Sequence, residues 1–260
     1  MVSEKTGRRE FARRAILGGV AASCGLALDS SGTVFAQSVS DNDILNFALN
    51  LEFLEAEFYT VATTGRRLAE IGIPVSGRRR QGDTIGGARV SLDARTQVVA
   101  EQIAADEQAH VRFLQAALRT SAVAKPAINL EALGVGFRSQ AEFLTVASIF
   151  EDVGVSAYGG AAPLIRKKTI LAAAAGIALT EGQHAGVLRY LVSQPSLPIP
   201  PVDGKAVPPL GQPNGRLFFV DGNGLSPART ASEVLRIVYA GGREGGGFFP
   251  DGVNGDISRA

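Results

Sequence analysis

The chain has 260 residues, of which 45% are hydrophobic, so it can bury a substantial core in one domain with appendages. Its 26 basic and 25 acidic side chains leave a net charge of +1, which gives no reason to expect nucleic acid as a partner. The single cysteine, Cys24, excludes an intrachain disulfide and a Cys-x-x-Cys metal or redox site.

The first 36 residues have the pattern of an export signal. The arginine pair Arg8-Arg9 precedes an apolar run that is too short to span a bilayer, and Val34-Phe35-Ala36 supplies small residues at a cleavage site. This pattern predicts a twin-arginine signal over residues 1–36 and a periplasmic or secreted protein with no membrane span once the signal is removed. A lipid anchor through Cys24 is the alternative, although the residues before it fit a lipidation motif poorly.

Residues 41–64 predict the first helix of the mature domain. Apolar residues recur at steps of three and four and form one stripe, made by Ile44, Phe47, Leu51, Leu54, Phe58 and Val61. Ser40 or Asp41 can cap the start of this helix, and Gly65 can end it. Its stripe predicts one face buried against partner helices.

Three more helices follow from the same periodicity, over about 92–120, from a cap at Ser139 to about 160, and over about 166–193. Ser139 and Glu142 have the spacing of a capping box, and Gly154, Gly159 and Gly160 predict a kink or a close approach in the third helix. Residues 121–138 form a connection long enough to run the length of a bundle. The fold predicted is an all-α four-helix bundle with one long crossover.

Two segments are rich in glycine, proline or arginine. Residues 66–90 predict a long loop that can hold a short hairpin. After the bundle domain, 37–194, residues 195–260 predict an irregular extension with a short helix at about 227–239, in which Pro227 takes an early helical position.

The chain contains two histidines, and each follows a glutamate by three positions, in Glu107-Gln108-Ala109-His110 and Glu181-Gly182-Gln183-His184. Positions i and i+3 share one face of a helix, so each pair directs a carboxylate and an imidazole to one point. One such pair is common on helix surfaces. Two pairs on two predicted inner faces indicate a shared site between helices.

The first and third helices supply a matching second repeat. Leu51-Glu52 is followed by Tyr59, and Phe150-Glu151 is followed by Tyr158 at the same seven-residue step. Glu55 is a second candidate on the first helix, but its counterpart in the repeat is Gly154, so the repeat favours Glu52. Glu57 is predicted to point away from the site.

The six candidate metal ligands are Glu52, Glu107, His110, Glu151, Glu181 and His184. Helical bundles hold two metal ions with this set, a Glu-x-x-His pair from each of two helices and one Glu from each of the others. Four buried carboxylates repel one another, and two divalent ions balance their charge. Oxygen and imidazole donors suit iron or manganese.

Geometry assigns roles within this set. Glu52 with His110 is expected to serve one metal ion and Glu151 with His184 the other, while Glu107 and Glu181 bridge the two. The tyrosines Tyr59 and Tyr158 can donate hydrogen bonds to ligand carboxylates.

Two runs carry a resemblance to a known family, NFALNLEFLEAEFY over residues 46–59 and DEQAHVRFL over residues 106–114. They resemble the ferritin-like domain family, and in particular an exported bacterial branch related to plant desiccation-related proteins. The resemblance spans about residues 40–194, and the tail from 226 to 255 is also similar to that branch. It implies a four-helix bundle and, by analogy with di-iron relatives, the six ligands named above.

Two functions are consistent with this sequence. The first is an iron or manganese centre that reacts with oxygen or peroxide in stress protection, as a ferroxidase, peroxidase or catalase. The second is a non-catalytic stress or desiccation-related protein with a structural or vestigial metal site. A homo-oligomer is compatible with either, and the fold alone does not choose between them.

Overall fold

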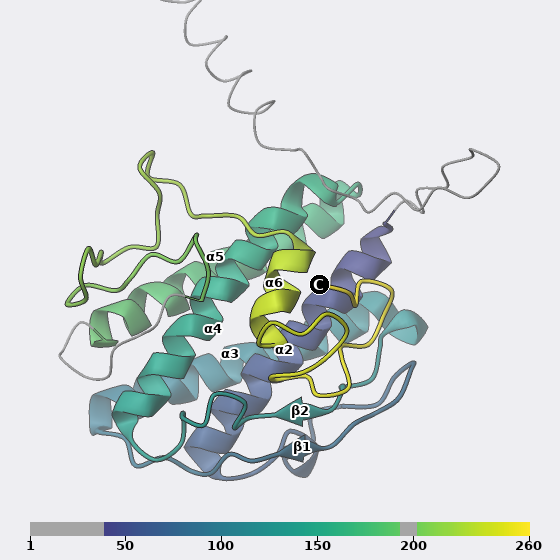
Figure 1. Ribbon diagram of the computed structural model, residues 1–260. Coiled ribbons are helices and arrows are strands. Elements are labelled where there is room, and N and C mark those ends of the chain that lie inside the picture. The colour runs from purple at the N-terminus through teal and green to yellow at the C-terminus, as the bar shows by residue number, and fades with distance from the viewer. Residues whose placement is uncertain (1–38, 193–201) are drawn as a thin grey trace, which may run out of the picture. The chain divides into compact units, whose positions relative to one another are not determined.

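The computed structural model describes residues 39–192 and 202–260. The predicted export signal lies outside these residues and stays a prediction. Four long helices form the domain: α2 (Asp41–Thr64), α3 (Ala94–Leu118), α4 (Gln140–Ala161) and α5 (Lys168–Val192). The prediction of an all-α four-helix bundle is confirmed (Figure 1).

The helices pack as two pairs, α2 with α3 and α4 with α5, and α2 also contacts α4 while α3 contacts α5. Contacts such as Tyr59 with Glu151 and Tyr158 with Glu52 show that α2 and α4 are antiparallel. The other adjacent pairs are antiparallel as well, which makes α3 and α4 parallel. The segment between α3 and α4 must therefore return along the bundle, and it is the long crossover that was predicted.

Local caps set the starts of α2, α3 and α4, whereas the start of α5 is bonded to a residue distant in sequence. Ser40 caps α2 in a capping box with Asp43, and the carboxylate of Asp41 instead accepts hydrogen bonds from the amides of Arg166 and Lys167 before α5. Gly65 ends α2 in the left-handed region, with φ at 75°.

The capping box predicted for α4 is half formed. Ser139 accepts the amide of Glu142, but the Glu142 carboxylate accepts from Gly136 and Arg138. The chain bends before Ser139 and brings these donors within reach, so the reciprocal bond of a capping box is not made.

Residues 66–90 do not form a hairpin. The two-residue strand β1 (Thr84–Ile85) pairs in parallel with β2 (Ile128–Asn129) of the crossover. Within residues 39–192, the connections also contain three short 3-10 helices, η1 (Ala69–Ile71), η2 (Arg119–Ser121) and η3 (Ala162–Leu164). Loop and crossover thus support each other along one side of the bundle.

The helix in the C-terminal extension is α6 (Ala231–Val238), which begins four residues later than predicted. Thr230 and Glu233 form a capping box, and this box rather than Pro227 sets the helix start. A kink or a close approach between helices was predicted at the glycines of α4. At Gly160 the segment before α6 makes a close approach, since a Cβ there would lie 1.8 Å from the Arg229 carbonyl oxygen.

Loops and extension bury α2 on all sides, from Ile44 to Thr63. Asn50 exchanges hydrogen bonds with the backbone of Asn254, and the Glu57 carboxylate accepts from the Leu68 amide and the Thr84 hydroxyl. Polar groups on the outer face of α2 are thus satisfied by segments that cross it. Glu57 lies away from the site, as expected, yet it is buried.

Among the residues described, no helix combines the length and apolar character needed to cross a bilayer.

Candidate metal centre

The structure brings together all six side chains that the sequence selected. Their donor atoms form two overlapping groups, each lying within 4.8 Å of one another: Glu52, Glu107, His110 and Glu181; and Glu107, Glu151, Glu181 and His184. Glu107 and Glu181 belong to both groups. Each group contains one histidine and one unshared glutamate, although the role of these residues as metal ligands stays a prediction.

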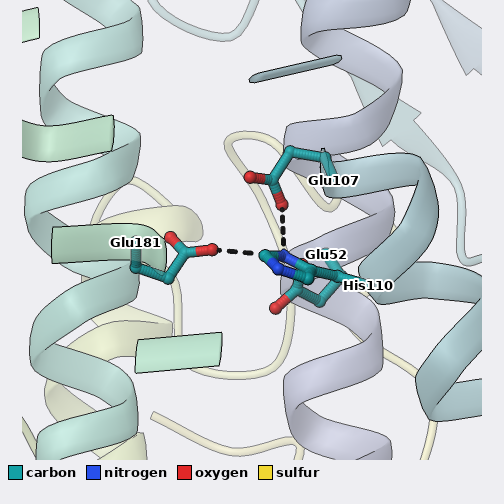
Figure 2. A group of neighbouring side chains, drawn as sticks. All are labelled: Glu52, Glu107, His110 and Glu181. Atoms are coloured by element: carbon teal, nitrogen blue, oxygen red, sulfur yellow. Dashed lines mark hydrogen bonds and ion pairs between the residues drawn. The ribbon is translucent and has the colours of Figure 1, made fainter. Parts of the chain in front are cut away.

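The histidines direct the same ring nitrogen into the cluster. His110 Nδ1 lies 3.1 Å from Glu52 Oε2, 3.2 Å from Glu107 Oε2 and 3.5 Å from Glu181 Oε1. Figure 2 shows Glu107 and Glu181 pointing toward the His110 ring from two different helices. His184 Nδ1 lies 3.1 Å from Glu107 Oε1 and 3.3 Å from Glu151 Oε2. In both histidines, the Nδ1 edge of the imidazole ring thus lies close to two or three carboxylates.

Several of these buried candidate ligand atoms have no hydrogen-bond partner among the described residues: Glu107 Oε1, Glu151 Oε2, both carboxylate oxygens of Glu181, and His184 Nδ1. His184 Nδ1 is close enough to Glu107 for an ion pair, but the geometry is not that of a hydrogen bond. Unsatisfied polar atoms are costly in a protein interior. A cation would satisfy all of them at once, so the residues present fit a metal centre.

Without a cation, the cluster holds protons strongly. Burial and the negative charge of Glu52 raise the pKa of Glu107 to about 8. Burial and neighbouring carboxylates, Glu107 first, raise the pKa of Glu181 well above its ordinary value. Burial lowers the pKa of His184, but contacts with neighbouring carboxylates outweigh it and raise that pKa to about 11.

The pKa of Glu52 moves in the opposite direction to those of Glu107 and Glu181. Burial acts to raise its pKa, but the hydrogen bond and charge of His110 outweigh burial and lower it. Without a metal ion, the protonated imidazole of His110 therefore supplies part of the positive charge that a cation would bring to this cluster.

The two tyrosines bond to the glutamates crosswise. The Tyr59 hydroxyl donates to Glu151 Oε1 at 2.6 Å, and the Tyr158 hydroxyl donates to Glu52 Oε1 at 2.5 Å. Each tyrosine therefore serves the glutamate of the other helix, because α2 and α4 run antiparallel. Each bond holds one oxygen and leaves the other directed at the histidines.

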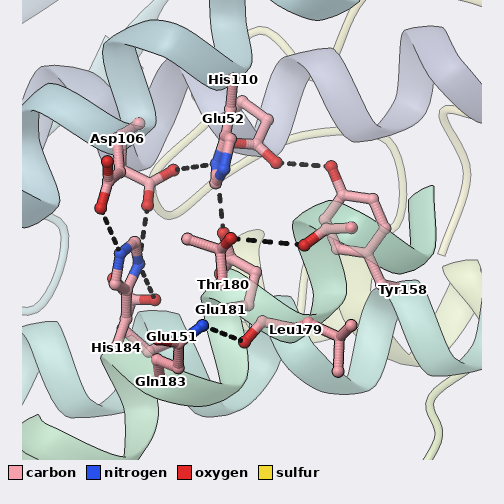
Figure 3. Close-up of polar contacts among 12 residues, drawn as sticks. Glu52, Asp106, His110, Glu151, Tyr158, Leu179, Thr180, Glu181, Gln183 and His184 are labelled. Carbon is pink, nitrogen blue, oxygen red and sulfur yellow. Dashed lines mark hydrogen bonds and ion pairs between the residues drawn. The ribbon is translucent and has the colours of Figure 1, made fainter. Parts of the chain in front are cut away.

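Sequence reasoning missed Asp106. His184 Nε2 lies 3.1 Å from Asp106 Oδ2, on the side of the ring opposite the cluster (Figure 3). Carboxylates in this position fix the orientation of a metal-bound histidine. The signal was available, since Asp106 directly precedes Glu107, but its counterpart in the other motif is Thr180, so the repeat did not select it.

Comparison with known proteins agrees with this architecture. A family model described as "Ferritin-like domain" matches residues 40–194, which is more than half of the chain. The chain belongs to the ferritin-like domain family. Its placement in an exported bacterial branch of that family stays a prediction.

Two known proteins are similar to this chain. The "Ferritin-like catalase Nec2" of Nesocodon mauritianus is 25% identical over 273 aligned positions, covering 85% of this chain and 85% of that protein. The "Desiccation-related protein PCC13-62" of Craterostigma plantagineum is 24% identical over 170 positions, covering 59% of this chain and 53% of that protein. The first similarity thus extends beyond the bundle into its appendages.

Proposed function

We propose that this ferritin-like protein binds two iron or manganese ions between its four helices and acts on hydrogen peroxide or oxygen. The observation that supports it most strongly is the pair of overlapping donor groups, buried and largely without hydrogen-bond partners. Iron and manganese accept this set of oxygen and imidazole donors. When bound, such ions supply redox change and Lewis acidity toward a small oxidant.

The protein side chains would have three tasks. Glu52 with His110 and Glu151 with His184 hold one position each, and the two carboxylates common to both groups hold the positions together. The tyrosines fix the outer oxygens of Glu52 and Glu151. The histidine side chains are only 12% and 7% exposed, so little bulk water reaches the site. A substrate the size of peroxide suits this restricted access.

The name of one relative favours peroxide over oxygen. The alignment with the ferritin-like catalase covers 85% of both chains, which is more than the bundle alone. Catalase chemistry converts two molecules of hydrogen peroxide into two of water and one of oxygen, and it needs no other electron donor.

The test is metal analysis and oxygen release with the full-length chain. Protein purified after growth with iron or with manganese is expected to hold about two ions per chain and to release oxygen from hydrogen peroxide. Glu107→Ala removes a carboxylate shared by both positions and should lose metal and activity together. Glu101→Ala, on an exposed part of the same helix, is the matched control.

A content below about 0.2 ions per chain, with the same melting temperature in wild type and Glu107→Ala, would refute the metal centre, since bound metal contributes to folding stability.

A non-catalytic role is the second candidate, and the similarity to the desiccation-related protein is the observation that favours it. In that case the metal is structural. Chelation should then lower the melting temperature, while the metal-loaded protein releases no oxygen from peroxide.

A further inference from the structure

A fifth glutamate lies beside the four glutamates and two histidines that define the candidate centre. Glu55 is one helical turn beyond Glu52 on α2 and only 5% exposed. None of the hydrogen bonds or ion pairs found among the described residues involves its side chain. A carboxylate buried in this way is costly unless something nearby compensates its charge.

Gly154 of α4 marks where this carboxylate points. A Cβ added at Gly154 would lie 2.7 Å from Glu181 Oε2 and 3.1 Å from Glu55 Oε1. Two carboxylates from different helices therefore converge on the space that a side chain at this position would fill. Gly154 lies inside a regular helix and not at a positive φ, so its backbone does not require glycine. The requirement is for space.

The internal repeat relates Gly154 of α4 to Glu55 of α2. Each lies three residues beyond a ligand glutamate. A side chain on α4 at this position would crowd the one on α2, since a Cβ there would lie 3.1 Å from Glu55 Oε1. In this chain α2 supplies the carboxylate at this position of the repeat.

We propose that Glu55 is a fifth carboxylate of the metal centre, and that Gly154 is glycine because Glu55 and Glu181 occupy its side-chain space. This inference rests on the proposed function. With two neutral imidazoles, four carboxylates balance two divalent ions, and Glu55 adds one further negative charge beside Glu181. The added charge strengthens the binding of cations and favours a centre of higher total positive charge.

Metal affinity, measured on metal-free full-length protein with manganese(II) alone, tests this inference. Glu55→Gln keeps the shape of the side chain and removes its charge, and we expect manganese binding about 10- to 100-fold weaker. Gly154→Ala should weaken binding as well, because a Cβ 2.7 Å from Glu181 Oε2 forces that carboxylate to move. The control is Gly159→Ala on the same helix, where a Cβ would meet Ala228 Cβ at an ordinary 3.7 Å.

The outcomes separate this inference from the proposed function. If the wild type binds no manganese or iron, the proposed function fails. If the wild type binds manganese and Glu55→Gln binds it equally well, only the role of Glu55 is overturned.

A crystal structure of the manganese-loaded wild type decides the matter even if the variants fold poorly. A Glu55 oxygen within about 2.2 Å of an ion supports the inference, and a closest approach beyond about 4 Å overturns it.

Discussion

The contact between Asp106 and His184 predicts a measurable effect on metal affinity. Replacing Asp106 with alanine removes the partner of His184 Nε2, 3.1 Å away, and leaves the ring free to rotate. Such partners are worth about 10- to 100-fold in affinity. The Asp106 side chain is 53% exposed, so water screens the pair and the lower end applies. We therefore expect a loss of about tenfold, or about 1.4 kcal/mol of binding free energy.

Competition titration with manganese(II) measures this loss, and the chain offers a matched control. Thr180 precedes Glu181 as Asp106 precedes Glu107, but its hydroxyl bonds to the Gly176 carbonyl oxygen. Thr180→Ala should therefore bind metal like the wild type. The reasoning is refuted if Asp106→Ala stays within about twofold of wild type, or if both variants lose affinity equally.

Three further predictions concern pH and the C-terminal extension. Metal ions must displace protons from Glu107 and His184, whose pKa values are about 8 and about 11, so manganese affinity should rise from pH 6 to pH 8 in calorimetric titrations. Without metal, both groups bind protons more strongly when folded than at their ordinary values of 4.5 and 6.5, so the melting temperature should fall as pH rises over this range. Arg229→Met breaks a bidentate ion pair between the buried Arg229 and Asp203, and it should lower the free energy of unfolding, measured by urea titration, by about 3 kcal/mol. Arg79→Met breaks an exposed ion pair and should lower it by less than about 0.5 kcal/mol.

The four bundle helices were predictable because their signals are local. The stripe on α2 and the caps at Ser40 and Ser139 lie within a few residues of the helices they define. The start of α6 was predicted wrongly even though its capping box, Thr230 and Glu233, is equally local, because Pro227 offered a competing start signal.

The pairing of β1 with β2 was not predictable in the same way. It joins Thr84 to Ile128, and neither two-residue strand has a pattern of its own. The burial of the outer face of α2 has a similar origin. Glu57 was predicted only to point away from the site, and segments distant in sequence, such as that at Asn254, explain how Asn50 and Glu57 are satisfied inside the protein.

The candidate site was predictable because the sequence contains an internal repeat. Residues of the site that lack a counterpart in the repeat were not predicted, because the repeat was used to select them. The repeat selected the six side chains that the structure brings together. It set aside Asp106 and Glu55, whose counterparts are Thr180 and Gly154. An internal repeat shows what two halves share, so residues that make the two halves differ need coordinates to be found.

The bonds between Asn50 and Asn254 join residues 204 positions apart, and they place the last part of the chain over the first helix of the domain. The ribosome makes α2 well before Asn254, so this part of its outer face is covered only after Asn254 has emerged. Contacts of such long sequence separation slow folding, because a large loop must close before they form. The bundle therefore completes this part of its core only after Asn254 has been synthesised, and a chain that lacks Asn254 would expose the outer face of α2, which is buried from Ile44 to Thr63.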